Sequence, residues 1–332
     1  MCDVFHIKTV LWLFLMLSIF SNTGQTQTGR VAFWNVENYF DTRNDTIKDD
    51  DAFTPQGENH WSVKRFEHKR DNIFKVITAL GAPMVVGLAE VENSYVLEQL
   101  CRATPLRKFG YKWVHFDSPD VRGIDCALLY RKDFFSPFCS KPIGMSNNSM
   151  NYFTRDVLMV GGITTAGDSL YFIVCHLPSK LGGEYAERQR ERIAKTVRNI
   201  VDTLATAHPS AAVVVMGDFN ADPDETDFRH TFGFDNGPTN PEGLTNLMYN
   251  IPVGEGSHNY GGQWSRLDQI MVRPPSESRF FIMPHAVVFK PDFMLETDER
   301  HQTSRPFRTY SGMKYKGGFS DHLPVYIDIN IK

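Results

Sequence analysis

Short runs of apolar residues, separated by polar segments, recur along the chain. Branched and aromatic residues dominate these runs, which is typical of β-strands. Several runs contain no alternating polar positions, so we expect strands that are buried on both faces. The predicted strands are Val31–Trp34, Met84–Leu88, Cys126–Tyr130, Leu170–Cys175, Ala212–Met216, Ile270–Val272 and Val325–Ile329.

Two longer segments have a helical period instead. Between Arg188 and His208, apolar residues recur at helical spacing and charged residues occupy the remaining positions, which predicts an amphipathic helix. A second helix is predicted over Val63–Leu80, where Gly81 and then Pro83 end the pattern. Both helices are expected to pack on a sheet. Two long stretches, Ala221–Gly262 and Pro291–Gly318, have neither period and are predicted to be functional loops.

Length and composition indicate one ordinary globular domain. The 332 residues are 42% hydrophobic and 22% charged, which excludes a disordered, collagen-like or multi-span membrane protein. The formal net charge is −4, so no basic field covers the whole protein, and a polyanionic substrate would have to be held locally. We find no internal repeat and no low-complexity linker.

The N-terminus has the pattern of an export signal. Lys8 precedes an apolar run of eleven residues, Val10–Phe20, and a polar stretch follows. We therefore predict a signal peptide over residues 1–28, a single domain over 29–332 and a periplasmic or secreted protein. The run is too short for a membrane span, so we expect no stable span after cleavage. An uncleaved anchor and a buried helix are the alternatives.

Cleavage would leave Cys101, Cys126, Cys139 and Cys175. An oxidising compartment permits disulfides between them without requiring any. Cys126 and Cys175 lie in apolar strand-like runs, so we expect buried thiols.

Polar residues of one chemical kind lie at the ends of several predicted strands. They are carboxylates and amides, with one serine and one histidine, and thiols are absent, which suits Mg²⁺, Mn²⁺ or Ca²⁺ rather than structural zinc. A lone carboxylate at a strand end is more often a turn former or helix cap, so the group carries more weight than any member. The positions are Asn35, Glu37, Asn38, Glu90, Glu92, Asp218, Asn220, Ser320, Asp321 and His322.

The motifs FWNVEN, GLAEVEN, CHLPSK, MGDFNADPDE, SRLDQIMV and FSDHLPV follow one another in this order between about residues 30 and 330. This series resembles that of the endonuclease/exonuclease/phosphatase superfamily, the deoxyribonuclease-I-like metal-dependent phosphoesterases, in a bacterial secreted form. The resemblance implies an α/β (α+β) fold. In that fold two mixed β-sheets lie face to face with helices outside, as a four-layer αββα sandwich.

The resemblance also implies roles for individual residues. Asn35, Glu90 and Asp321 match the metal site, which would hold one or two ions of Mg²⁺ (or Mn²⁺). Asp218 matches the residue that orients or deprotonates the attacking water, and Asn220 the residue that steadies it.

Three further positions match the phosphate-facing groups. Asp268 and His322 match an Asp–His pair in which the imidazole contacts the scissile phosphate, and His176 matches a second such histidine. Phosphate-ester hydrolysis needs a positioned water, one free carboxylate and positive charge around the phosphoryl oxygens, and this set can supply them.

Other residues near the motifs have two readings each. Arg122 and Asp125 lie where the family approaches the phosphate, or they form a structural ion pair. Glu37 and Asp41 are extra metal ligands or residues outside the metal's coordination. Arg305, Arg308 and Tyr310, with Lys314 and Tyr315, would pair with phosphates and stack on bases, or they belong to a solvated surface. The same two alternatives hold for the basic residues near Trp61 and for Arg188 and Arg192. Tyr260 and Trp264 either stack on bases or belong to the core.

We expect a divalent-metal-dependent phosphodiesterase, an extracytoplasmic nuclease that hydrolyses DNA or RNA with a metal- and Asp-activated water. A phosphomonoesterase or a lipid or inositol phosphoesterase is the alternative. Two positions count against an inositol phosphatase. Ala221 follows Asn220, where those enzymes typically have an aromatic residue, and Gln269 follows Asp268, where they typically have an arginine. The second alternative is a non-catalytic module that binds a phosphate ligand. The expected partner is nucleic acid or another phosphate ester, and no protein partner is indicated.

Overall fold

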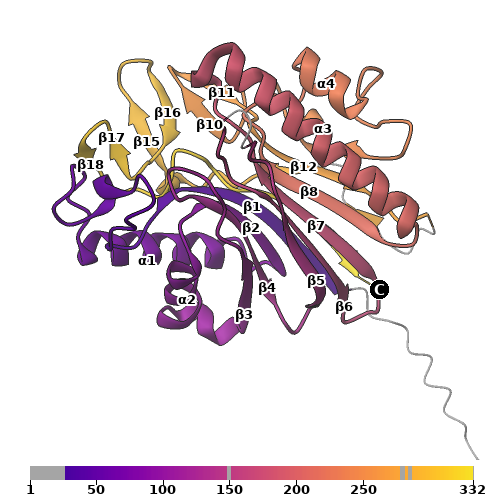
Figure 1. Cartoon of the computed structure of the whole chain (residues 1–332), viewed down its shortest axis with the longest axis horizontal. Helices are drawn as coiled ribbons and strands as arrows, with labels where there is room; N and C mark the ends of the chain where they lie inside the picture. The colour runs from indigo at the N-terminus through magenta and orange to yellow at the C-terminus, as the bar shows by residue number, and fades with distance from the viewer. Residues whose placement is uncertain (1–26, 148–150, 277–280, 283–285, 332) are drawn as a thin grey trace, which may run out of the picture.

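Two mixed β-sheets lie face to face in the computed structural model, which describes residues 27–147, 151–276, 281–282 and 286–331 (Figure 1). The first sheet has seven strands in the order β13–β19–β1–β2–β4–β3, and β14 also pairs with β19. Their bounds are β1 Gln27–Tyr39, β2 Val85–Val91, β3 Tyr111–His115, β4 Asp125–Arg131, β13 Phe281–Ile282, β14 Val287–Val288 and β19 Val325–Ile331.

The second sheet has six strands in the order β5–β6–β7–β8–β12–β9. Their bounds are β5 Phe135–Ile143, β6 Val157–Thr164, β7 Ser169–His176, β8 Ala212–Asp218, β9 Thr245–Asn246 and β12 Asp268–Arg273. In each sheet one central pair is parallel, β1 with β2 and β7 with β8, and its neighbours are antiparallel.

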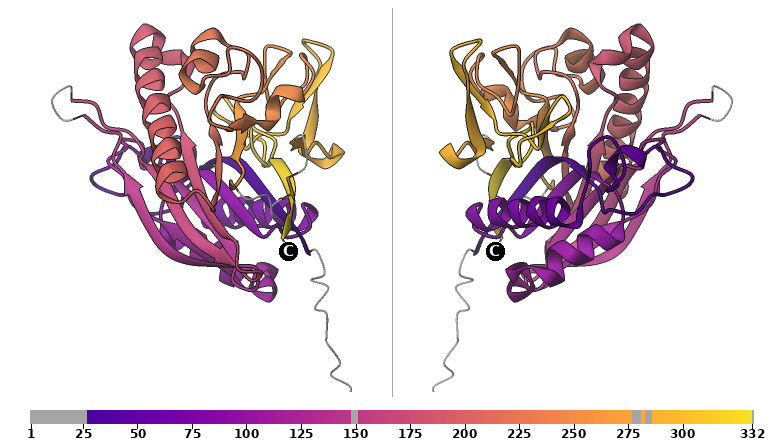
Figure 2. Two further views of the ribbon diagram at one scale, coloured as in Figure 1. Left: turned by 90° about the vertical axis from the view of Figure 1, so that its right-hand side faces the viewer. Right: turned by 90° about the vertical axis from the view of Figure 1, so that its left-hand side faces the viewer.

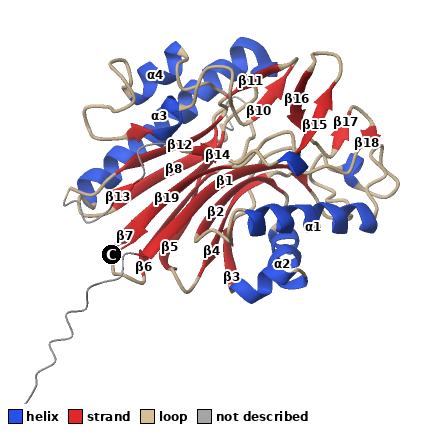
Figure 3. Cartoon of the chain, turned by 180° about the vertical axis from the view of Figure 1, so that it is seen from behind, coloured by secondary structure: helices blue, strands red, loops and turns tan. Residues whose placement is uncertain are grey.

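Helices cover the outer face of each sheet (Figures 2 and 3). Helices α1 (Val63–Ala79) and α2 (Ser94–Ala103) pack on the first sheet, and α3 (Gly183–Ala207) and α4 (Thr226–Phe232) on the second. Along β1, Val31 and Phe33 face the other sheet, whereas Ala32 and Trp34 face the helices. Both faces are therefore buried, which is why the strands are continuously apolar. The predicted four-layer αββα sandwich is confirmed.

All seven predicted strands form, and both predicted helices form. Helix α1 begins after Ser62, whose side chain accepts a hydrogen bond from the Arg65 amide, and Gly81 with φ 84° follows its end. Helix α3 begins at Gly183, five residues before the predicted start at Arg188. Helix α2 and strands β3 and β5 were not predicted, because their apolar residues are interrupted by charged or polar ones. Strand β6 was also not predicted; its apolar run is interrupted by Gly161 and Gly162.

The two stretches predicted to be irregular are partly ordered. Ala221–Gly262 contains α4 and β9, and Pro291–Gly318 contains two hairpins, so the prediction was wrong for these segments. Strands of two to four residues are too short to establish a period. The additional strands are β10 His258–Tyr260, β11 Gln263–Ser265, β15 Leu295–Asp298, β16 Thr303–Pro306, β17 Tyr310–Ser311 and β18 Lys314–Tyr315. Short 3₁₀ helices are Asp51–Phe53, Pro105–Phe109, Lys180–Gly182, Leu247–Asn250 and Asp292–Met294.

Residues 1–26 of the predicted signal peptide lie outside the described residues. Strand β1 begins at Gln27, within the predicted signal peptide, and Gln27 pairs with Ile331 of β19. Within the described part of the chain, no helix has the length and hydropathy needed to cross a membrane.

The four described cysteines are free thiols, in agreement with the buried-thiol prediction for Cys126 and Cys175. Cys101 is also buried, whereas Cys139 is exposed on β5. Burial raises the pKa of the Cys101, Cys126 and Cys175 thiols above its usual range.

We therefore expect a thiol reagent to modify Cys139 alone among these four in the native protein, since a buried, protonated thiol reacts poorly. Denaturation should expose the other three. Mass spectrometry of labelled peptides checks this, and rapid native labelling of Cys126 or Cys175 would contradict the burial of these strands.

Candidate active site

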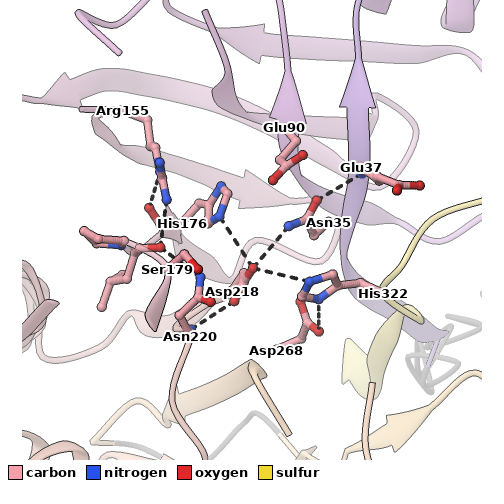
Figure 4. A network of polar contacts seen from close by, with 12 residues as sticks. Asn35, Glu37, Glu90, Arg155, His176, Ser179, Asp218, Asn220, Asp268 and His322 are labelled. Atoms are coloured by element: carbon pink, nitrogen blue, oxygen red, sulfur yellow. Dashed lines mark hydrogen bonds and ion pairs between the residues drawn. The ribbon is translucent and has the colours of Figure 1, made fainter. Parts of the chain in front are cut away.

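The predicted site residues gather where strands of both sheets end (Figure 4). His176 ends β7 and Asp218 ends β8, and the two are paired in parallel register. Asp268 begins the antiparallel strand β12 directly opposite Asp218. Asn35 and Glu90 come from β1 and β2 of the first sheet, so the site lies across the line where the two sheets meet.

Local backbone geometry directs these side chains. The pairing of β1 with β2 shifts register after Asn35, and that of β2 with β4 shifts around Glu90. Four non-glycine residues beside the site have positive φ: Glu37 (53°), Asn38 (51°), Glu90 (62°) and Asn220 (48°). Bulges and left-handed residues of this kind re-aim side chains and concentrate at functional sites.

Asp218 is the centre of the polar network, and only 1% of it is exposed. Its Oδ2 accepts a hydrogen bond from Asn35 Nδ2 at 3.1 Å, and its Oδ1 accepts one from the Asn220 amide at 2.9 Å. The Nε2 atoms of His176 and His322 lie 3.5 and 3.7 Å from Asp218 Oδ2. Burial raises the pKa of Asp218 to about 7, although His322 opposes the shift.

His322 forms the predicted pair with Asp268, with 2.8 Å between Nδ1 and Oδ2. Burial disfavours charge on His322, but the carboxylates of Asp268 and Asp218 outweigh it and raise the pKa of His322 well above its usual range. Ser257 completes the pair, since its hydroxyl donates to Asp268 Oδ2 and accepts from the Asp268 amide. Sequence reasoning did not identify Ser257, which lies in a segment without a clear period.

His176 is held in a different protonation state from His322. Burial, reinforced by the positive charges of Arg155 and Arg122, lowers the pKa of His176 well below its usual range, so its imidazole is neutral at pH 7. Arg155 donates to the carbonyl oxygens of His176 at 2.7 Å and Leu177 at 2.8 Å. It also pairs at 3.4 Å with Asp120, which lies between β3 and β4 of the first sheet. Arg155 was missed because its partners are distant in sequence.

Asn35 and Glu90 come from the neighbouring strands β1 and β2 and extend into the same part of the site (Figure 4). One Glu90 oxygen accepts from the Asn38 amide at 2.9 Å, which leaves the other free. Asn35 Oδ1 accepts from the Glu37 amide at 3.0 Å and keeps a second lone pair. Asp321 contributes another carboxylate, paired with Arg308 at 2.9 Å. This all-oxygen donor set fits a hard divalent cation.

Glu37 lies outside this set, in a buried ionic network. Its carboxylate accepts from Arg308 at 3.1 Å and from the Thr309 amide at 2.7 Å. The Lys69 amine lies 4.0 Å away and is itself 99% buried as a side chain. Burial, with Asp321 nearby, raises the pKa of Glu37 to about 7, and burial lowers that of Lys69 to about 8. These contacts favour the reading of Glu37 as a residue outside the metal's coordination.

The predicted substrate-binding residues divide into two groups. Arg122 reaches the site edge, 2.9 Å from Asn38 Oδ1 and 3.6 Å from Glu90, with about half of its side chain exposed. Arg308 is also at the site. Asp125 is buried, accepts from the Ser118 amide at 3.1 Å and lies 3.3 Å from His115 Nε2. The ion pair between Arg122 and Asp125, the predicted alternative, does not form between these described residues.

Arg305 and Tyr310 are engaged elsewhere. Arg305 pairs with Glu296 across the β15–β16 hairpin at 2.9 Å. The Tyr310 ring is buried against Trp61 and Phe53, and its hydroxyl donates to the Asn59 carbonyl. The prediction that Tyr310 stacks on a base does not fit this packing, because its faces are covered.

Most of the other basic residues also have partners within the protein. The ring of Tyr260 is mainly exposed, whereas Lys290 covers the Trp264 ring. Arg65 donates to the carbonyls of Asn59 and His60 and covers the ring of Tyr315. Arg70 pairs with Asp71, and Arg188 pairs with Glu184. Arg192 donates to the Met145 carbonyl.

We expect Ser257→Ala to reduce kcat by about tenfold or more with little change in KM. A hydrogen bond to a charged group is worth about 1.5–3 kcal/mol, and its loss would loosen the Asp268–His322 pair. Steady-state kinetics checks this, with Ser265→Ala on β11 as the control. A raised KM with unchanged kcat would contradict a positioning role.

The fold and the site together define a phosphoester hydrolase of the four-layer sandwich class. The family model described as Endonuclease/Exonuclease/phosphatase family matches residues 30–331. The chain therefore belongs to the endonuclease/exonuclease/phosphatase family.

Solved structures with this fold are similar over nearly the whole chain. D. rerio TDP2 complexed with single-strand DNA product is 18% identical, with a TM-score of 0.58 over 92% of this chain and 99% of that one. The Bacteroides thetaiotaomicron mannosyl-6-phosphatase is 17% identical, with a TM-score of 0.57 over 91% and 99%. The human Nocturnin catalytic domain with bound sulfate is 18% identical, with a TM-score of 0.56 over 92% and 95%. None of the curated proteins matches the sequence.

Proposed function

We propose that this protein is a divalent-metal-dependent phosphodiesterase of the nuclease type, in which Asp218 activates a water that attacks the phosphorus. The observation that carries the proposal is the surroundings of Asp218. The buried Asp218 carboxylate accepts a hydrogen bond from the side-chain amide of Asn35. It also lies within 3.7 Å of the imidazoles of His176, whose neutral form is favoured, and His322, whose cationic form is favoured.

The residues divide the chemistry as follows. Asp218 Oδ2 accepts the proton of the attacking water, while the Asn35 and Asn220 contacts hold the carboxylate in place. The cationic His322, held by Asp268, stabilises the negative charge of the phosphoryl oxygens. Neutral His176 donates a hydrogen bond to the same group. Asn220 Nδ2 donates to the Leu177 carbonyl at 3.0 Å and so fixes the loop after β7.

Asn35, Glu90 and Asp321 would hold the metal ion, Mg²⁺ or Mn²⁺. When bound, the ion supplies Lewis-acid stabilisation of charge on the phosphoryl and leaving oxygens.

A phosphomonoesterase is the second candidate, and a specific observation favours it. Arg305 and Tyr310, which would contact a polymer, are engaged within the protein. Arg122 remains at the site edge with about half of its side chain exposed, whereas Arg308 is paired with Glu37 and Asp321, so the exposed positive charge suits a compact phosphate ester. The similarity to a mannosyl-6-phosphatase is compatible with this candidate.

The test is hydrolysis by the purified mature chain with Mg²⁺, with Mn²⁺ and with chelator. Plasmid DNA, single-stranded RNA and bis-p-nitrophenyl phosphate report diester cleavage. A hexose 6-phosphate and p-nitrophenyl phosphate report monoester cleavage, and sphingomyelin and an inositol polyphosphate report the remaining classes. Metal-dependent cleavage of either polymer is expected. Intact polymers with release of phosphate from the hexose ester would favour the second candidate, and no turnover at all would favour a binding module.

We also propose that the protein acts in the periplasm or outside the cell, on the basis of the predicted signal peptide. N-terminal sequencing of the mature protein from cell fractions tests this. A cytoplasmic protein that retains Met1 would contradict it.

A further inference from the structure

A second group of metal-ligating side chains lies where β3 ends and β4 begins. His115 is the last residue of β3, and Asp125 is the first of β4. His115 Nε2 faces Asp125 Oδ2 at 3.3 Å, and only 2% of the His115 side chain and 5% of the Asp125 side chain are exposed. Among the described residues, His115 Nε2 has no hydrogen-bond partner. A buried polar atom without a partner is costly and needs an explanation.

The separation of these two atoms suits a shared ion better than a direct bond. A charge-assisted N–H···O bond is about 2.7–2.9 Å long. Two ligands that bind a tetrahedral zinc ion at about 2.0–2.1 Å lie about 3.3–3.4 Å apart. Asp125 Oδ1 is occupied by the Ser118 amide, which leaves Oδ2 for the ion.

Asp117 is the nearest third ligand. Its Oδ1 lies 3.8 Å from His115 Nδ1, not from the Nε2 that faces Asp125, so its side chain, which is 81% exposed, would turn toward Nε2 to share the ion. One ligand atom from each of the three residues lies within 4.8 Å of the others. Three protein ligands with one remaining position for water is a common zinc arrangement.

An ion can reach this group from an acidic cavity of about 510 Å³. Its lining includes Asp117 and Asp125 and two further carboxylates, those of Asp45 and Asp50. Glu92 also lines it, but burial raises the pKa of Glu92 to about 8, so it carries little charge at pH 7. Lys48 also lines it, but its amine is held by the carbonyls of Ser118 and Asp120. The carboxylates outnumber the lysine, so the cavity attracts cations.

We propose that His115, Asp117 and Asp125 bind a transition-metal ion, with Zn²⁺ as the best match, at a site separate from the oxygen-ligand site at Asn35 and Glu90. The imidazole of His115 supplies a nitrogen ligand, which favours zinc over the hard cations Mg²⁺ and Ca²⁺. Imidazoles of His258 and His322 also lie beside Asp321 at the active site, so the two sites are distinguished by their place in the fold.

The ion would fasten both ends of the segment 116–124. This segment carries Asp120, which pairs with Arg155 beneath His176, and Arg122, which reaches Glu90. Zinc binding would therefore order the edge of the active site. This consequence for catalysis rests on the proposed function, whereas zinc binding itself does not.

The experiment measures Zn²⁺ binding to the full mature chain by competition with a chromophoric chelator, in excess Mg²⁺. One Zn²⁺ per chain is expected. Asp117→Asn should bind Zn²⁺ at least about tenfold more weakly, and His115→Gln likewise. Asp292→Asn, which replaces an exposed aspartate distant in sequence, should bind as the wild type does. Because Asp117 is exposed, its variant is expected to fold, and circular dichroism checks this.

Two outcomes would overturn the proposal: no stoichiometric Zn²⁺ binding to the wild type, or equal affinity in wild type, Asp117→Asn and His115→Gln. Glu90→Gln separates the sites, since it should retain the Mg²⁺-insensitive Zn²⁺ site. If Zn²⁺ binds as expected but no phosphate ester is hydrolysed, the proposed function fails and the zinc site stands. If phosphate esters are hydrolysed and Zn²⁺ does not bind, the zinc site fails and the proposed function stands.

Discussion

Asp218→Asn is expected to reduce metal-dependent phosphoester hydrolysis by about 10²–10⁴-fold, the usual contribution of a positioned general base. The amide has nearly the same volume and can still accept the bond from the Asn220 backbone, but it cannot take a proton from water. The effect should fall on kcat, and single-turnover measurements on whichever ester the wild type hydrolyses would establish it.

Asp227→Asn is the matched control for this variant. Asp227 is exposed on α4, so its substitution should leave both hydrolysis and the thermal midpoint unchanged. Full activity in Asp218→Asn, with its fold intact, would remove Asp218 from the role of base.

Lys69→Met is expected to lower the free energy of unfolding by about 3–5 kcal/mol, the cost of removing one partner from a buried ion pair. The Lys69 amine donates at 2.6 Å to both Thr309 Oγ1 and the Phe319 carbonyl, and it offsets the charge of Glu37. Methionine fills the space but leaves Thr309 Oγ1 and the Phe319 carbonyl without this donor and the buried Glu37 carboxylate without this positive charge. Denaturant unfolding measures the change.

Two variants test this reasoning. Lys64→Met replaces an exposed lysine of the same helix and should change stability by no more than about 0.5 kcal/mol. Adding Glu37→Gln to Lys69→Met should recover part of the loss, because no uncompensated carboxylate remains. A double variant less stable than Lys69→Met alone would contradict the assigned pairing.

The sequence predicted those parts of the site that lie next to strands. Asp218 follows the apolar run of β8 closely, so a correct strand prediction also placed its side chain at the edge of the sheet. The same reasoning placed Asn35 and Glu90 at the ends of the first two strands. His176 and Asp268, at the ends of β7 and β12, were assigned through the family resemblance.

Residues that act across the fold were harder to predict. Arg155 and Asp120 meet only because the two sheets pack together, and no local pattern encodes that meeting. Lys69 had a usable signal, because it lies three residues after Phe66 and four before Ile73, on the buried stripe of α1. Tyr310 follows polar residues and appears exposed in sequence, but its ring packs against aromatic residues from the segment between β1 and α1.

The pairing of β1 with β19 has a consequence for biosynthesis. The first described strand lies between β2 and β19, the last described strand, so a growing chain has an open sheet edge along β1 until β19 has been synthesised. The residues just before β19 also hold the site together: Ser320 donates to the Asn35 carbonyl at 2.7 Å, and Trp34 donates to that of His322 at 2.9 Å. A nascent chain that lacks this last segment therefore has neither a closed first sheet nor an assembled hydrolytic centre.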